Sequence, residues 1–201
     1  PYTTLFRSSD PEPFTIGYLG RIAPEKGLHV LCEAYHRLVS RGTAPGPCRL
    51  WAAGYLGPEH RGYLAGIRKQ MTQWGLDEQF QYHGELDRSA KLAFLRELSV
   101  LSVPGSYADP KGLFLLEAMA SGVPIVQPRR GAATEIVETS GGGVLVAPED
   151  PEALADGLFG LMADPARRRQ LADAGYAGVR THYSSTVMRD RALDVYRSLL
   201  T

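Results

Sequence analysis

The chain has 201 residues, of which 44% are hydrophobic and 22% are charged, and this is the composition of an ordinary globular protein. Its 22 basic and 22 acidic residues give a formal net charge of zero, which argues against a nucleic acid as the partner of the whole chain. Two cysteines are too few for a disulfide framework, and no apolar run reaches the roughly 18 residues of a membrane span, so a cytoplasmic or membrane-peripheral location is expected.

The opening PYTTLFRSS fits neither a helix nor a strand template. Residues 1–13 are therefore predicted to be a disordered or non-native leader. Residues 14–201 contain no interdomain linker and no internal repeat, and they are predicted to form one domain.

From residue 14 onward, short apolar runs alternate with helical patterns. Strands are predicted at 14–20, 48–56, 79–86, 99–106, 124–130 and 141–148. Helices are predicted at 28–39, 58–75, 88–98 and 113–122, followed by a helical tail from 151 whose last helix spans 185–200. Strands that alternate with helices at this spacing favour an open parallel sheet of about six strands with helices on both faces, a Rossmann-like α/β fold.

The segment GRIAPEKG, residues 20–27, follows the first predicted strand and carries two cations. Gly20 lets a ligand approach the backbone closely, and Arg21 offers a planar fork that suits phosphate oxygens. Lys26 is expected in the first turn of the next helix, beside the positive end of its dipole. The segment matches neither the Walker A nor the GxGxxG pattern. It favours an anion site, and the alternative is that both cations are exposed loop charges.

The segment DPKGLFLLE, residues 109–117, places one carboxylate before a helix and another inside it. Gly112 and Leu113 open this helix, so their amides are expected to be free to meet an anion. Asp109 and Glu117 can accept hydrogen bonds from hydroxyls. A ligand with hydroxyls on both sides of a diphosphate would satisfy both kinds of group. In the alternative interpretation, Asp109 caps the helix and Glu117 is a surface charge.

These segments are expected to converge in space. Gly20, Tyr55, Gly84, Glu85 and the stretch 106–112 each follow a predicted strand. In open parallel sheets, ligands bind outside the carboxyl ends of the strands, so one shared site at this edge is predicted.

GRIAPEKG, HGEL followed by a helix, and DPKGLFLLEAMASGVPIVQPRRGAATEIV resemble, in order and spacing, the C-terminal half of retaining glycosyltransferases of family 4. That family has the two-domain GT-B fold, and the resemblance runs from about Phe14 to the end of the chain. It implies that Arg21 and Lys26 bind the diphosphate of a nucleotide-sugar donor. It also implies that Glu117 holds the nucleotide ribose and that Asp109 contacts hydroxyls of the donor sugar.

By the same resemblance, the amides near Gly112 and Leu113 would cap the phosphates, and the turn around Gly84 and Glu85 would lie near the base. The family usually has Glu at the position of Asp109, and Pro-Phe-Gly where this chain has Pro-Lys-Gly. Lys111 therefore either adds a phosphate contact or points to solvent. His83 and Glu135 lie near the motifs and could have a direct or a structural role.

The implied reaction is transfer of the sugar to an acceptor hydroxyl with retention at the anomeric carbon. No cofactor or metal is expected, because the cations and the helix N-terminus would stabilise the departing diphosphate. The resemblance further implies a glycan, lipid or small-molecule acceptor held by an N-terminal domain absent from this sequence, with possible peripheral membrane association of the full enzyme. The last helix would then expose an apolar face that packs on the missing half, and these residues alone would transfer little sugar.

Three alternatives stay open. One is a noncatalytic nucleotide- or glycan-binding module. Another is an epimerase or a phosphorylase on a related fold, and the third and weakest is an NAD-dependent dehydrogenase, because the glycine fingerprint is broken.

Overall fold

The computed structural model describes residues 12–42 and 45–199. Its centre is one six-stranded parallel sheet with the strand order β3-β2-β1-β4-β5-β6. The strands are β1 (Phe14–Leu19), β2 (Cys48–Ala53), β3 (Phe80–Tyr82), β4 (Val100–Leu101), β5 (Ile125–Pro128) and β6 (Gly143–Val146). All six residues of β1 are buried, as expected for a central strand covered on both faces. The predicted Rossmann-like α/β architecture is confirmed.

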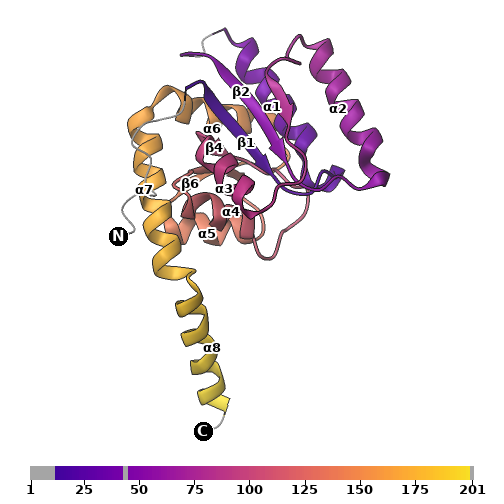
Figure 1. Ribbon diagram of the computed structural model, residues 1–201. Coiled ribbons are helices and arrows are strands. Elements are labelled where there is room, and N and C mark those ends of the chain that lie inside the picture. The colour runs from indigo at the N-terminus through magenta and orange to yellow at the C-terminus, as the bar shows by residue number, and fades with distance from the viewer. Residues whose placement is uncertain (1–11, 43–44, 200–201) are drawn as a thin grey trace.

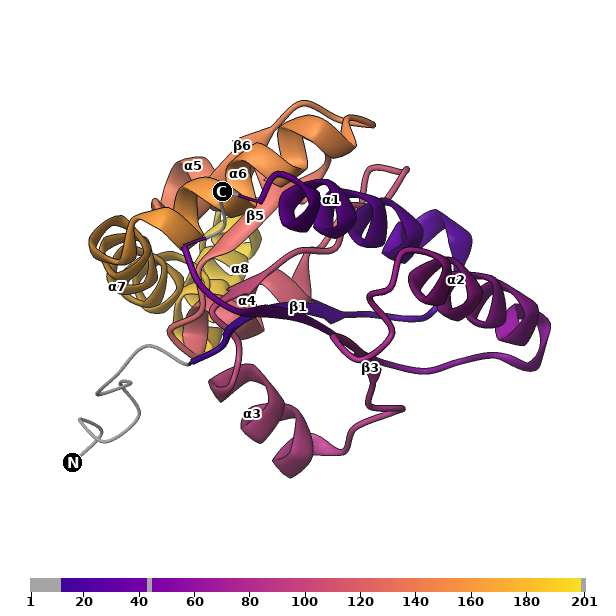
Figure 2. The same cartoon turned by 90° about the horizontal axis from the view of Figure 1, so that it is seen from above.

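Helices cover both faces of this sheet (Figure 1). They are α1 (Leu28–Ser40), α2 (Arg61–Gln73), α3 (Arg88–Arg96), α4 (Leu113–Ala120), α5 (Ala132–Ser140), α6 (Pro151–Ala163), α7 (Pro165–His182) and α8 (Ser185–Leu199), with 3-10 turns η2 (Pro24–Lys26) and η3 (Pro58–His60). The apolar sides of α1, α2 and α6 share one buried cluster, and those of α3, α4 and α5 share the other. Figure 2 shows α3 on the side of β1 opposite to α1 and α2.

The strands are shorter than predicted, mostly at their carboxyl ends. The apolar runs that favoured strands at 48–56, 79–86 and 99–106 continue past the last paired residue into loops. Two of these loops contain glycines with positive φ, Gly54 at 139° and Gly84 at 76°, and this backbone conformation takes the chain out of the sheet. The extra residues therefore form the rim of the sheet instead of extending its strands.

Two helical predictions need correction. The helix predicted from residue 58 begins as the 3-10 turn η3, and the α-helix starts at Arg61. Helix α5 was not predicted, although it is amphipathic and buries Ala133, Ile136 and Val137. It is only nine residues long, so its pattern barely exceeds two turns.

Helix α8 extends away from the rest of the domain (Figure 1). None of its residues is buried, and its exposed large apolar side chains are Met188, Leu193, Val195, Tyr196 and Leu199. The exposed apolar face expected of the last helix is thus present. Within residues 12–42 and 45–199, no helix is both long and apolar enough to cross a membrane. Residues 1–11 of the predicted leader, and Leu200 of the predicted last helix, lie outside the described residues.

Candidate functional site at the carboxyl edge of the sheet

The loops that leave β1, β2 and β3 are joined to one another by backbone hydrogen bonds. The amide of Ile22 donates to the carbonyl of Tyr55 at 2.8 Å, and the amide of Gly54 donates to the carbonyl of Gly84 at 2.8 Å. A Cβ atom at Gly54 would lie 2.0 Å from the carbonyl oxygen of Gly20, so this junction requires glycine. The predicted convergence of Gly20, Tyr55 and Gly84 at one edge is present in the structure.

The loops that follow β1 and β4 are also joined. Here the sheet order reverses, because β1 has β2 on one side and β4 on the other. Gly27 closes η2 with φ of 75°, and a Cβ there would lie 2.0 Å from the carbonyl oxygen of Pro104. The amide of Ser106 donates to the carbonyl of Glu25 at 2.9 Å. The two loops therefore meet at the topological switch point, where open α/β sheets bind ligands.

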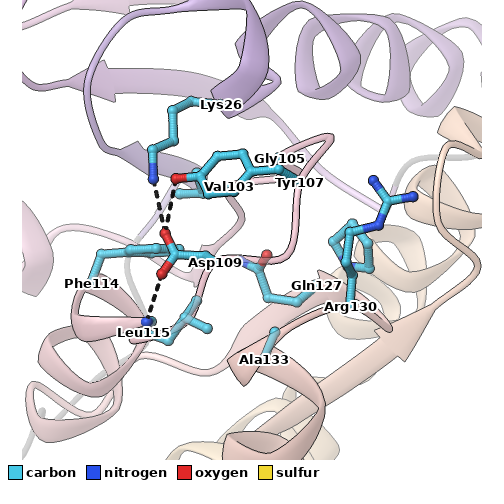
Figure 3. A pocket seen from close by; sticks show the side chains of 12 residues that line it. Lys26, Val103, Gly105, Tyr107, Asp109, Phe114, Leu115, Gln127, Arg130 and Ala133 are labelled. Atoms are coloured by element: carbon cyan, nitrogen blue, oxygen red, sulfur yellow. Dashed lines mark hydrogen bonds and ion pairs between the residues drawn. The ribbon is translucent and has the colours of Figure 1, made fainter.

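This meeting brings Lys26 and Asp109, 83 positions apart, into an ion pair of 2.9 Å between Nζ and Oδ2 (Figure 3). Their side chains are only 16% and 27% exposed. Lys26 lies in the 3-10 turn η2 before α1, not in the first turn of the α-helix as predicted. Its ammonium also lies 4.8 Å from the ring centroid of Tyr107. Partial burial lowers the pKa of Lys26, but its contacts with Tyr107 and Asp109 outweigh that effect and raise it.

Asp109 has three further donors. Oδ1 accepts from the amides of Lys111 and Gly112, both at 3.0 Å, and Oδ2 also accepts from the hydroxyl of Tyr107 at 3.2 Å. Burial acts to raise the pKa of this carboxyl, but the hydrogen bonds from Gly112, Lys26 and Lys111 hold it well below its ordinary value. Asp109 is thus a stable carboxylate that bonds the turn leading into α4. It is not the helix cap of the alternative interpretation, because the N-cap of α4 is Gly112 and, among the described residues, no side chain bonds to the helix start.

The hydrogen bonds to Asp109 overturn the expectation that the amides of both Gly112 and Leu113 are free. The Gly112 amide is not free, because it is bonded to Asp109. The Leu113 amide has no partner among the described residues, and its side chain is 60% exposed. The free donor at the start of α4 is therefore at Leu113. Lys111 is exposed.

Glu117 lies on α4 and pairs with Lys91 of α3. Its side chain is 42% exposed, and Lys91 is its one ion-pair partner among the residues that the structure describes. Its carboxylate therefore keeps acceptor positions for other donors. Lys91 did not emerge from the sequence, because only the packing of α3 beside α4 brings it to Glu117. Its one sequence signal was its place on the predicted helix 88–98.

Arg21 extends from the β1 loop and is 49% exposed. It forms an ion pair with Glu25, four positions further on and 39% exposed. The carbonyl of Arg21 accepts a hydrogen bond of 2.9 Å from the buried Tyr18 hydroxyl. The backbone at this position is therefore fixed while the guanidinium faces solvent.

A pocket lies beside Asp109 (Figure 3). Its polar lining includes Lys26, Tyr107, Gln127 and Arg130, and its volume of about 30 Å³ has room for little more than a water molecule. Arg130 donates to the carbonyl of Ser106 and pairs with Glu149 at 2.7 Å, so it holds the loop that carries Tyr107 and Asp109. Sequence reasoning did not single out Arg130 or Tyr107, although Arg130 ends one predicted strand and Tyr107 directly follows another at the same edge.

His83 and Glu135 differ in their surroundings. The His83 ring packs against Trp51 and Phe94, with ring centroids 4.6 and 5.4 Å away, and burial lowers its pKa. This favours a structural role for His83. Glu135 and Glu85 are both exposed, in the first turn of α5 and in the loop after β3.

The edge therefore combines two half-exposed groups, Arg21 and Glu117, with a closely bonded centre around Asp109, all on a Rossmann-like domain. The model of the family described as glycosyl transferases group 1 matches residues 5–178. The chain belongs to this family, and its fold matches the C-terminal domains of GT-B glycosyltransferases.

Relatives and solved structures agree with this membership. A phosphatidyl-myo-inositol mannosyltransferase of Mycobacterium leprae is 30% identical over 188 residues, which are 93% of this chain and 47% of that protein. The C-terminal domain of a glycosyl transferase group 1 family protein, LpcC of Francisella tularensis, is 29% identical with a TM-score of 0.76, and 88% and 89% of the two chains are covered. HepE of Anabaena, solved in complex with UDP, shares the fold with a TM-score of 0.82 at 21% identity, over 92% of this chain and 49% of HepE. The chain spans about half the length of the mannosyltransferase.

Proposed function

We propose that this chain is the donor-binding domain of a retaining glycosyltransferase of family 4. It binds a nucleoside-diphosphate sugar and supports transfer of the sugar to an acceptor hydroxyl. The observation that carries the proposal is the meeting of the β1 and β4 loops at the switch point, where Arg21, Lys26 and the start of α4 face the same edge as Glu117. Family membership supports it, as do a relative named as a mannosyltransferase and a structural neighbour solved with UDP.

The diphosphate would lie between Arg21, Lys26 and the start of α4. Arg21 has an exposed guanidinium, which suits bidentate contact with phosphate oxygens. The free amide of Leu113 lies at the positive end of the α4 dipole, which favours an anion. Gly20 leaves space for the ligand beside the backbone, and exposed Lys111 can add a long-range attraction.

The nucleoside would extend from the phosphates toward α3. Glu117 is the ribose ligand in this arrangement, because its half-exposed carboxylate has acceptor positions left. Lys91 of α3 holds this carboxylate in place through their ion pair. Gly84 and Glu85, in the loop after β3, would line the base.

The donor sugar would lie near Asp109, whose carboxylate can accept from a sugar hydroxyl only after one of its present donors leaves. During transfer, the bond between the anomeric carbon and the β-phosphate oxygen breaks, and negative charge collects on the departing diphosphate. Arg21, Lys26 and the α4 terminus would stabilise that charge, so the proposal needs no metal. In the retaining course, the acceptor attacks from the face that the phosphate leaves, and the phosphate helps to remove its proton.

The acceptor remains part of the proposal for the whole protein. We place a glycan, lipid or small-molecule acceptor on a separate N-terminal domain, so transfer requires both domains. Donor binding, in contrast, is expected of residues 14–201 alone.

Calorimetric titration with UDP, GDP, ADP and NAD tests the proposal. Saturable binding of one nucleoside diphosphate, and none of NAD, is the expected result. Glu117→Ala should weaken that binding by about tenfold or more, since ribose contacts to a charged acceptor are lost. Glu138→Ala is the matched control, because Glu138 is also a half-exposed, ion-paired helical glutamate, on α5. Equal affinities for wild type and Glu117→Ala would reject the ribose role.

A further inference from the structure

The carboxylate of Asp109 is saturated with hydrogen-bond donors. The backbone amides of Lys111 and Gly112 donate to Oδ1. The Lys26 ammonium and the Tyr107 hydroxyl donate to Oδ2 (Figure 3). An ionised carboxylate has about four lone-pair positions, and four donors occupy them here. A fifth donor, such as a hydroxyl of a bound sugar, can bond to Asp109 only if one of the four leaves.

The four donors differ in how firmly they are held. The amides of Lys111 and Gly112 belong to the backbone that starts α4, and Gly112 is buried. Lys26 is charged, mostly buried, and 2.9 Å from Oδ2. Breaking the contact with Gly112 or with Lys26 would leave a polar group without a partner in a poorly solvated place. The Lys111 amide is exposed, but it belongs to the same backbone turn as the Gly112 amide.

Tyr107 is the exception. Its hydroxyl is a neutral donor, its bond to Oδ2 is the longest of the four at 3.2 Å, and the residue is 38% exposed. If the hydroxyl leaves Asp109, water can replace its hydrogen bond. The neighbouring Ser106 is held on both sides, by the Glu25 carbonyl and by Arg130, so a side-chain rotation of Tyr107 suffices and the loop backbone need not move.

We propose that the Tyr107 hydroxyl occupies the position of a sugar hydroxyl on Asp109 Oδ2 and is displaced when a sugar nucleotide binds. Tyr107 then sets the preference of the site for a sugar nucleotide over the bare nucleoside diphosphate. It is a positioning residue that acts through Asp109, and the inference rests on the proposed function. The small volume beside Asp109 agrees with it, because the Tyr107 side chain lines that pocket and its rotation away from Asp109 would enlarge it.

The test compares two affinities in wild type and in Tyr107→Phe. The probes are UDP and UDP-glucose, or GDP and GDP-mannose if the titrations select guanine. The variant keeps the ring beside Lys26 and removes the competing hydroxyl. It should bind the sugar nucleotide about two- to tenfold more tightly, the range expected from one hydrogen bond, with the affinity for the nucleoside diphosphate unchanged. An unchanged or lower ratio of the two affinities would overturn the inference.

Two further variants exclude a general structural effect. Tyr176→Phe removes a tyrosine hydroxyl on α7, where it accepts from Arg180, and should leave the ratio as in wild type. In an Asp109→Asn background, the side-chain carbonyl can keep its bonds to the two amides while an NH₂ group takes the place of Oδ2. Adding Tyr107→Phe there should leave the ratio unchanged, and a rise would mean that the hydroxyl does not act through Asp109.

The measurements also separate this inference from the proposed function. If the wild-type chain binds none of the nucleoside diphosphates, the proposed function fails and the role of Tyr107 fails with it. If the wild-type chain binds both probes but Tyr107→Phe leaves their ratio unchanged, only the role of Tyr107 is rejected.

Discussion

The centre of the site and its two flanks are built differently. At the centre, Lys26 and Asp109 are mostly buried, and Asp109 has four donors. At the flanks, Arg21 and Glu117 are about half exposed, and each has one ion-pair partner. The centre joins two loops that are distant in sequence, whereas the Arg21 pair lies within one loop and the Glu117 pair joins two helix surfaces.

This difference predicts that the centre and the flanks contribute unequally to stability. Charges that are partly buried and fully hydrogen-bonded are costly to disturb, because a lost partner leaves the other group unpaired. Exposed pairs contribute little to stability and exchange partners readily. We therefore expect the centre to keep the edge in shape and the flanks to adapt to the donor.

The largest expected effect is on transfer by the full-length enzyme. Lys26→Ala and Arg21→Ala should each lower the rate by about 10²- to 10³-fold, the usual cost of losing one electrostatic donor to a departing charge. The comparison predicts that they differ in stability. Lys26→Ala should lower the free energy of unfolding, whereas Arg21→Ala should leave it within about 0.5 kcal/mol of wild type. Rates and urea unfolding curves on the same preparations check both.

Arg197→Ala is the control for these variants, because Arg197 forms an exposed ion pair on α8. It should change neither the transfer rate nor the free energy of unfolding. Turnover like that of wild type in both Lys26→Ala and Arg21→Ala would reject the phosphate assignment.

The second effect is on stability alone. Asp109→Ala removes the acceptor of two amides and leaves Lys26 mostly buried without its partner. We expect a loss of about 2 kcal/mol in the free energy of unfolding, between the values for exposed and for fully buried charged groups. Asp87→Ala is the matched comparison, since Asp87 caps α3 through the Ala90 amide but is exposed. A loss in Asp109→Ala no larger than that in Asp87→Ala would show that the ion pair with Lys26 adds no stability beyond the amide hydrogen bonds.

A smaller effect should appear in the pH dependence of stability. The pKa of Asp109 is lower in the folded chain than its ordinary value of about 3.9, so the folded state favours the ionised carboxyl. Its contribution is complete above that value and is lost as the pH falls below about 4. Unfolding curves at about pH 5 and about pH 3 should therefore show a smaller acid-induced loss in Asp109→Asn than in wild type. Equal acid-induced losses in the free energy of unfolding would mean that a carboxylate other than Asp109 causes the pH dependence.

The sequence was sufficient for the architecture because the relevant signals are local. Alternating apolar runs and helical faces predicted a six-stranded parallel sheet, and the rule that ligands bind at the carboxyl edge predicted which loops converge. The predicted strands were too long at their carboxyl ends because an apolar residue such as Val103 can be buried in a loop as well as in a strand. Hydrophobicity alone does not show where the pairing stops.

The details of the site depend on distant packing. Lys91 contacts Glu117 because α3 packs beside α4. Tyr107 contacts Asp109 because of the path of the loop that carries both residues. The expected free amide at Gly112 was wrong for a related reason. A carboxylate four positions before a helix can either face a ligand or bond the backbone of the turn that leads into the helix, and both uses fit the same residues.

The smallest expected effect concerns Glu25, which pairs with Arg21 at the exposed flank. In Glu25→Gln, the free energy of unfolding should stay within about 0.5 kcal/mol of wild type, because exposed pairs contribute little. Affinity for the nucleoside diphosphate should rise by about two- to threefold, since a negative charge that competes with the phosphates for Arg21 is gone. The gain should shrink as salt is added, because screening weakens the same repulsion in wild type. Titrations of wild type and Glu25→Gln at low and high salt measure this gain in affinity. A lower affinity would mean that Glu25 orients Arg21 toward the ligand, and the flank would then be as preorganised as the centre.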